Sequence, residues 1–166
     1  MICPGGGFRD IWIDREGHDL AIWLKDHNVT SLVLKYRTRP AEMTSREMWQ
    51  NYQNAVQADG RQAIRILREQ AKDLGLDPHK IGICGFSAGG HLCETLCTNF
   101  TADTYKPIDD VDQQNCRPDF ALLIYPAYLT EPSDSNEVDP LVKDLRRNAT
   151  PPMFMAIARN DRFTRG

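Results

Sequence analysis

The chain has 166 residues, a length typical of one globular domain, and 41% of them are apolar, which is enough for an ordinary hydrophobic core. Its 20 Lys and Arg residues against 23 Asp and Glu residues give a net charge of −3, which excludes the strongly basic face of a nucleic-acid-binding protein. Apolar runs are too short to span a bilayer. The sequence predicts one domain over residues 1–166, with no nucleic-acid partner and no membrane span.

The five cysteines are odd in number and form no Cys-x-x-Cys pair. Cys93 and Cys97 lie four residues apart on a predicted helix, where the geometry disfavours a disulfide. The four histidines show no metal-ligand spacing with the thiols. We therefore predict reduced, buried cysteines, no metal and no cofactor.

The first half of the chain predicts two helices and a strand after a glycine-rich loop. Residues 1–7 indicate the end of a strand entering that loop, and apolar residues at helical spacing predict a helix over 16–27. Residues 29–36 are typical of a buried strand, and 40–50 of a loop. A period near 3.6 predicts a long helix over 51–74.

The second half predicts three more buried strands and one helix. The strands are expected over 81–84, 120–125 and 153–158, the helix over 88–99, and irregular polar stretches over 101–118 and 126–152. Apolar strands separated by helices or long crossovers indicate an α/β fold, a three-layer α/β/α sandwich around a mostly parallel sheet. Ligands bind such sheets beyond the carboxyl ends of the strands.

One motif lies at such a position. Gly85-Phe86-Ser87-Ala88-Gly89 follows a predicted strand and opens a helix, the setting of a Gly-x-Ser-x-Gly nucleophile elbow. A serine on this sharp turn has strained backbone angles, and the flanking glycines let strand and helix approach closely. The alternative is a glycine-rich turn whose serine does no chemistry.

The second motif is Pro4-Gly5-Gly6-Gly7, whose main-chain N–H groups can face an oxyanion. The alternative is a phosphate-binding loop, but the Lys-[Ser/Thr] pair of nucleotide loops is missing. The loop therefore favours acyl transfer.

With these two motifs the chain resembles α/β-hydrolases of the esterase/lipase superfamily, in the acetyl-xylan-esterase-like and feruloyl-esterase-like branch. The resemblance rests on residues 3–7, 33–37, 63–65, 81–92, 117–120, 124–126 and 150–152. Related lipases have His-Gly-Gly-Gly, and here Pro4 replaces the histidine, as in the sugar-ester branch.

The resemblance implies Ser87 as nucleophile and an oxyanion hole formed by the N–H groups of Gly6, Gly7 and Ala88. It also implies Asp161 as the triad acid, in agreement with the Ser, Asp, His chain order of this fold. The alternative for Asp161 is a solvated loop aspartate.

The order Ser, Asp, His requires a histidine after Asp161, and the last five residues contain none. We expect His91 to pack beside the sheet and His18, His27 and His79 to lie on other surfaces. We therefore expect an α/β-hydrolase domain that is incomplete at both ends, without the first strands and without the segment bearing the histidine.

Together these expectations predict a serine carboxyl-ester hydrolase that forms an acyl-enzyme. Its expected substrate is a small-molecule or sugar ester with a short acyl group. Two alternatives stay open: a peptidase or amidase on the same fold, and a catalytically incompetent fragment or relative. The substrate pocket is expected near Phe8, residues 37–49 and residues 125–128. The sequence leaves the cellular compartment undecided.

Overall fold

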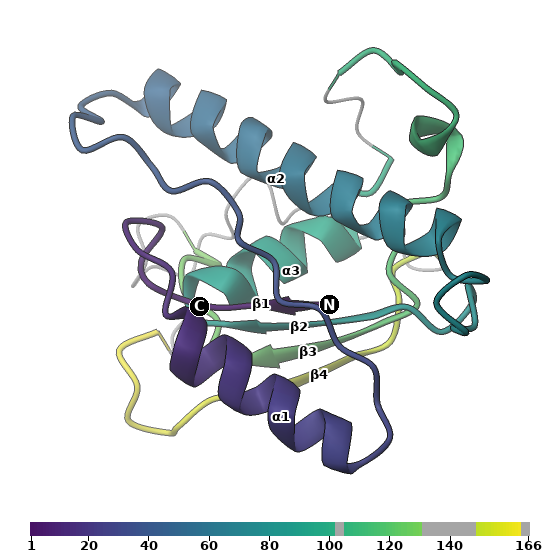
Figure 1. The fold of residues 1–166 in the computed structure, drawn as a ribbon. Coiled ribbons are helices and arrows are strands. Elements are labelled where there is room, and N and C mark those ends of the chain that lie inside the picture. Colours follow the sequence, from purple (N-terminus) through teal and green to yellow (C-terminus); the bar gives the residue numbers. More distant parts are fainter. Residues whose placement is uncertain (102–104, 131–148, 164–166) are drawn as a thin grey trace.

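The computed structural model describes residues 1–101, 105–130 and 149–163, so parts of both predicted polar stretches lie outside the described residues. The described residues form three layers, with α2 and α3 above a sheet and α1 below it (Figure 1). This confirms the predicted α/β/α sandwich. No helix among the described residues is long and apolar enough to cross a membrane.

Within the described ranges the sheet has four parallel strands, in the order β1-β2-β3-β4. They are β1 (Ile2–Cys3), β2 (Gly82–Phe86), β3 (Phe120–Ile124) and β4 (Met153–Ala156). Cys3 pairs with Gly85, Gly85 with Leu123, and Leu123 with Met155. All strands point the same way, so their carboxyl ends meet at one edge, at the left of Figure 1.

The predicted strand over residues 29–36 is wrong in extent. This segment makes a single parallel bridge, between Val33 and Ile2, through two hydrogen bonds: Ile2 N–H donates to Leu32 O (2.7 Å) and Leu34 N–H donates to Ile2 O (2.8 Å). Because β1 is two residues long, the segment has little strand beside it with which to pair.

The helix predicted over 16–27 begins earlier and is divided. A π-helical turn covers Ile13–His18, and α1 follows over Asp19–Asp26. Gly17 lets this turn pack directly on the extended segment around Val33. A Cβ at this position would lie 2.7 Å from the Val33 side chain.

The long helix α2 covers Arg46–Glu69, so it begins and ends five residues before the predicted bounds of 51 and 74. Ser45 caps its N-terminus by accepting a hydrogen bond from Met48 N–H at 3.1 Å. The cap sets the start of the helix, and Trp49 therefore lies inside α2 and not at the end of a loop.

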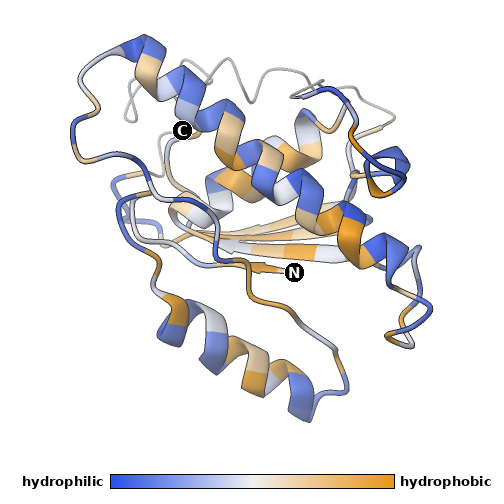
Figure 2. Cartoon of the chain, turned by 45° about the horizontal axis from the view of Figure 1, so that its top comes forward, coloured by the Kyte–Doolittle hydropathy of each residue, from blue (hydrophilic) through white to orange (hydrophobic). Residues whose placement is uncertain are grey.

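The helix α3 (Ala88–Thr98) is the centre of the core, because all of its residues are buried between α2 and the sheet. Figure 2 shows apolar colours in the strands beneath α2, which is itself largely polar. Leu92 and Leu96 of α3 and Ile83 and Leu123 of the sheet are at most 1% exposed. On the other face, which α1 covers only in part, Phe120 and Leu122 of β3 are exposed.

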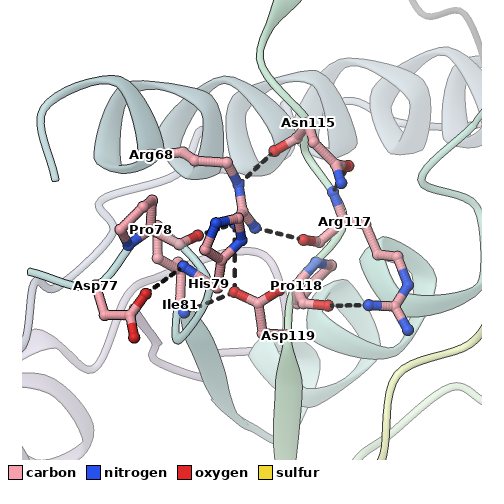
Figure 3. A network of polar contacts seen from close by, with 9 residues as sticks. All are labelled: Arg68, Asp77, Pro78, His79, Ile81, Asn115, Arg117, Pro118 and Asp119. Carbon is pink, nitrogen blue, oxygen red and sulfur yellow. Dashed lines mark hydrogen bonds and ion pairs between the residues drawn. The ribbon is translucent and has the colours of Figure 1, made fainter.

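The amino-terminal edge of the sheet is held by one arginine (Figure 3). Arg68 of α2 donates to the carbonyls of Pro78, Asn115 (2.8 Å) and Arg117 (2.7 Å), and to Asp119 Oδ2 (3.3 Å). Its side chain is 9% exposed. One guanidinium therefore fixes the two segments that lead into β2 and β3.

We predict that Arg68→Ala lowers the free energy of unfolding by about 3 kcal/mol, because it leaves several half-buried acceptors without their donor. Urea unfolding followed by circular dichroism measures the change. Lys72→Ala, an exposed cation just beyond α2, is the matched control and should change stability by less than about 0.5 kcal/mol. A similar small loss in both variants would contradict the prediction.

Candidate active site

Ser87 lies in a strained turn between β2 and α3. Its φ is 49° and its ψ −117°, which a residue with a Cβ rarely adopts. Three main-chain bonds hold it: Ser87 N–H donates to Ile124 O, and Ser87 O accepts from His91 N–H and Ala127 N–H, each at 3.1 Å. Ser87 is partly exposed, so the turn presents its side chain at the carboxyl edge of the sheet.

The two glycines of the motif allow close contacts that a side chain would block. A Cβ on Gly85 would lie 2.2 Å from Gly89 O, and one on Gly89 would lie 2.0 Å from Cys3 O. The end of β1 therefore rests directly on the turn. A Cβ on Gly5 would lie 3.0 Å from the Ser87 Cβ, so the glycine loop and the serine are direct neighbours.

The three loop glycines differ in what their N–H groups contact. Gly5 is buried, and its N–H is bound to a side chain. Gly6 (φ 132°) and Gly7 (φ 63°) are half-buried, and among residues 1–101, 105–130 and 149–163 no acceptor takes their N–H groups. The N–H of Ala88 lies in the first turn of α3, where helical N–H groups have no partner within the helix.

Side chains hold both polar groups of the peptide unit between Pro4 and Gly5. Tyr36 Oη donates to Pro4 O at 2.5 Å, and Gly5 N–H donates to Glu16 Oε2 at 2.6 Å. Glu16 Oε1 accepts in turn from Tyr125 Oη at 2.9 Å. Burial raises the pKa of both tyrosines, and the Glu16 hydrogen bond raises that of Tyr125 further. Both phenols therefore stay protonated donors at neutral pH.

An aromatic cluster lies beside the glycine loop, centred on Phe8. Its ring centroid lies 5.7–6.1 Å from those of Tyr36, Trp49, Tyr52, His91 and Tyr128. Phe8 itself is fully buried, so it supports the surface and does not line it. Trp49 and Tyr128 are half-buried, and these two can reach a ligand.

Asp161 lies in the turn after β4, where its N–H donates to Ala158 O (3.0 Å) and its Oδ1 accepts from Phe163 N–H (2.9 Å). The Phe163 ring packs on Tyr128 at 5.5 Å between centroids, which joins this turn to the aromatic cluster. Asp161 is thus on the same edge of the sheet as Ser87. Its catalytic role stays a prediction.

The histidines lie as the sequence predicted. His91 is fully buried on α3, edge-on to Phe8 and Tyr128, while His18, His27 and His79 are exposed. His18 and His27 belong to the segments around α1, and His79 belongs to the turn before β2.

With this geometry established, comparison with known proteins gives the family. Residues 34–125, more than half of the chain, match the BD-FAE family profile. The chain belongs to the BD-FAE family. This finding confirms the resemblance to the acetyl-xylan-esterase-like branch.

Individual relatives of this BD-FAE chain include an acetylxylan esterase from Xylanibacter ruminicola. It is 30% identical over 123 residues, which cover 74% of this chain and 21% of the esterase.

Two solved structures are similar. An acetyl ester-xyloside bifunctional hydrolase from Caldicellulosiruptor lactoaceticus has 32% identity and a TM-score of 0.71, covering 92% of this chain and 58% of that one. MGS-M1, an α/β-hydrolase enzyme from a Medee basin deep-sea metagenome library, has 28% identity and a TM-score of 0.67, with 93% and 52% covered. The chain therefore has the α/β-hydrolase fold and spans part of the length of these relatives.

The five cysteines of this BD-FAE chain all lie within the described residues. All five thiols are free, and four are buried. Burial raises the pKa of Cys84 to about 11, so the thiol is protonated at neutral pH. Among the described residues no group of three or more His, Cys, Asp or Glu side chains could hold a metal ion.

An open cavity of about 840 Å³ lies elsewhere, against α1 and residues 28–31. Its lining contains none of the predicted site residues. We assign it no part in the predicted chemistry, because Ser87, the predicted nucleophile, does not line it.

Glu16, Tyr36 and Tyr125 were not predicted from the sequence as partners of the glycine loop. Glu16 had the appearance of an ordinary first residue of a helix, and its partners Gly5 and Tyr125 lie 11 and 109 residues away. No local pattern joins residues so distant. The Arg37–Asp59 ion pair (2.5 Å), which ties the segment after Val33 to α2, was not predicted either.

We predict that Ser87→Gly stabilises the protein by about 1 kcal/mol, because glycine adopts these backbone angles without strain. Thermal unfolding measures this as a raised Tm. Ser87→Ala is the matched control: it also removes the hydroxyl but keeps the Cβ, and should leave Tm close to that of the unaltered protein. Equal Tm values for the two variants would show that the turn stores no strain.

Proposed function

We propose that this chain supplies the nucleophile and the oxyanion donors of a serine carboxyl-ester hydrolase. The observation that supports this best is the contact of the triple-glycine loop with the strained Ser87 turn at one edge of the sheet. A hydroxyl on a tight turn suits acyl transfer when it lies beside main-chain N–H groups that have no acceptor within the described part of the chain, because negative charge develops on the carbonyl oxygen.

In this proposal Ser87 Oγ attacks the ester carbonyl carbon while a histidine takes the hydroxyl proton. The N–H groups of Gly6, Gly7 and Ala88 stabilise the oxyanion. The C–O bond to the alcohol then breaks, and the histidine returns the proton to the leaving oxygen. Water attacks the acyl-enzyme in the same way, which releases the carboxylic acid and restores the serine.

Asp161 is proposed to orient that histidine. His91 is a poor base for Ser87, because its ring is enclosed by aromatic side chains. The fold's chain order places the histidine after Asp161, and residues 162–166 hold none. We therefore propose that a histidine outside residues 1–166 supplies the imidazole.

The proposed substrate is a short-acyl ester of a sugar, with acetylated xylose units as the first choice. This rests on the names of two relatives, an acetylxylan esterase and an acetyl ester-xyloside hydrolase. The half-buried rings of Trp49 and Tyr128 agree with a sugar, because aromatic side chains offer flat apolar contact to one face of a pyranose.

We predict that Ser87→Ala lowers kcat for p-nitrophenyl acetate by about a thousandfold or more, because it removes the attacking oxygen. The assay uses the protein together with any residues that its gene encodes after residue 166. Ser31→Ala, a serine lining the cavity at α1, is the control and should keep full activity. Hydrolysis by Ser87→Ala at the rate of the unaltered protein would exclude serine catalysis.

The substrate class is tested by two comparisons of kcat/KM. One sets p-nitrophenyl acetate against p-nitrophenyl octanoate, which share a leaving group, and the other sets acetylated xylooligosaccharides against acetyl p-nitroanilide. We expect the acetate to be preferred over the octanoate, and the acetylated sugar over the anilide. A preference for the anilide would favour the amidase alternative, and a preference for the octanoate would contradict the short-acyl assignment.

A further inference from the structure

We propose that Glu16 is a positioning residue that fixes the glycine loop in the orientation needed to bind an oxyanion. This inference rests on the proposed function and adds a residue outside the nucleophile, the triad and the oxyanion donors. Three structural observations support it.

The first is that Glu16 holds a peptide unit that precedes the two proposed loop donors. Gly5 N–H donates to Glu16 Oε2 at 2.6 Å, while Tyr36 Oη holds the carbonyl at the other side of the same peptide plane, that of Pro4. A peptide plane bound at both its N–H and its C=O cannot rotate without losing two hydrogen bonds. The direction of the next N–H groups, those of Gly6 and Gly7, depends on that plane.

The second observation is that the Glu16 carboxylate joins the segments on both sides of the nucleophile strand. Gly5 follows β1 and Tyr125 follows β3, and β2 lies between these strands. The Tyr125 ring lies 5.8 Å from the ring of Phe86, the residue before Ser87. Glu16 therefore ties together the two loops that flank the serine.

The third observation is that Glu16 completes a set of bonds that hold three successive peptide units of the loop. Gly5 O accepts from Trp12 N–H (3.0 Å) and Gly6 O accepts from Arg9 N–H (3.0 Å) and Asp10 N–H (3.1 Å), whereas the first unit is held by the side chains of Glu16 and Tyr36. Gly6 and Gly7 are both at positive φ, and a glycine has a wide choice of backbone angles. Donors that must be preorganised need an external constraint, because reorienting them during the reaction would cost the free energy they are meant to supply.

The same contacts argue against Glu16 as a general base. Both carboxylate oxygens already accept hydrogen bonds, one from Gly5 and one from Tyr125. The carboxylate thus acts through the loop, and its effect should appear in turnover more than in substrate binding.

The test combines amide NMR of Gly5, Gly6 and Gly7 with steady-state kinetics on p-nitrophenyl acetate. In Glu16→Ala we expect the Gly5 amide to lose its downfield shift and its exchange protection, and the Gly6 and Gly7 amides to move. We expect kcat to fall by about tenfold or more, while KM changes by less than about twofold. Glu16→Gln should restore most of kcat, because its amide oxygen can accept from Gly5 and its NH₂ can donate to the Tyr125 oxygen.

Asp14→Ala is the matched control, since Asp14 lies on the same helical turn with an 86% exposed side chain and should affect neither measurement. If Glu16→Ala does not fold, Tyr125→Phe removes one of the two bonds, and the Gly5 to Gly7 amides should still move. Unmoved amides in a folded variant would overturn the inference, as would an unchanged kcat or a loss confined to KM.

Failure of the inference and failure of the proposed function give different results. An enzyme that needs Ser87 but keeps its kcat in Glu16→Ala overturns the role of Glu16 alone. Turnover that survives Ser87→Ala overturns the hydrolase proposal, and the catalytic role of Glu16 with it.

Discussion

The backbone angles of Ser87 are the constraint on which the rest of the site depends. A φ of 49° with a ψ of −117° costs a residue with a side chain about 1–3 kcal/mol, so the turn persists only because its surroundings determine it. Main-chain bonds to Ile124 and Ala127 hold it from the side of β3, and the end of β1 packs on Gly89. Three parallel strands that end at one edge make this arrangement available.

The two edges of the sheet are held by different means. At the amino-terminal edge, Arg68 fixes the segments entering β2 and β3 with donors aimed at carbonyl oxygens. At the carboxyl edge, the backbone of the glycine loop is held by the side chains of Glu16 and Tyr36, and the next N–H groups have no acceptor among the described residues. One edge is satisfied internally, whereas the other presents unused donors, as a binding site for a developing negative charge requires.

The aromatic cluster connects this edge to the core. Phe8 follows the glycine loop directly, is fully buried, and contacts rings from α2, α3 and the segment after β3. A side chain anchored this firmly fixes the far end of the loop, as Pro4 and Gly5 are fixed at the near end. The glycines between these two anchors can therefore adopt only a narrow range of backbone angles, although an unconstrained glycine adopts a wide range.

The sequence by itself determined the order and type of most elements, because buried parallel strands and amphipathic helices have strong hydrophobic patterns. The strand–turn–helix at Ser87 was predictable for the same reason, with the glycine spacing as an additional local signal. The bounds of the elements were predicted less accurately than their type. The cap at Ser45 starts α2 five residues before the predicted start. The predicted strand around Val33 forms one bridge, because its partner β1 is short.

Only the tertiary structure decided which side chains hold the glycine loop. Glu16, Tyr36 and Tyr125 meet through hydrogen bonds that span 11 to 109 residues of sequence, and no periodicity records such a contact. Local propensity fixes what a segment becomes, whereas the direction in which an N–H or a carboxylate points depends on how separate segments pack. That is the physical reason the Ser87 turn could be found from the sequence and the side chains that bind the glycine loop could not.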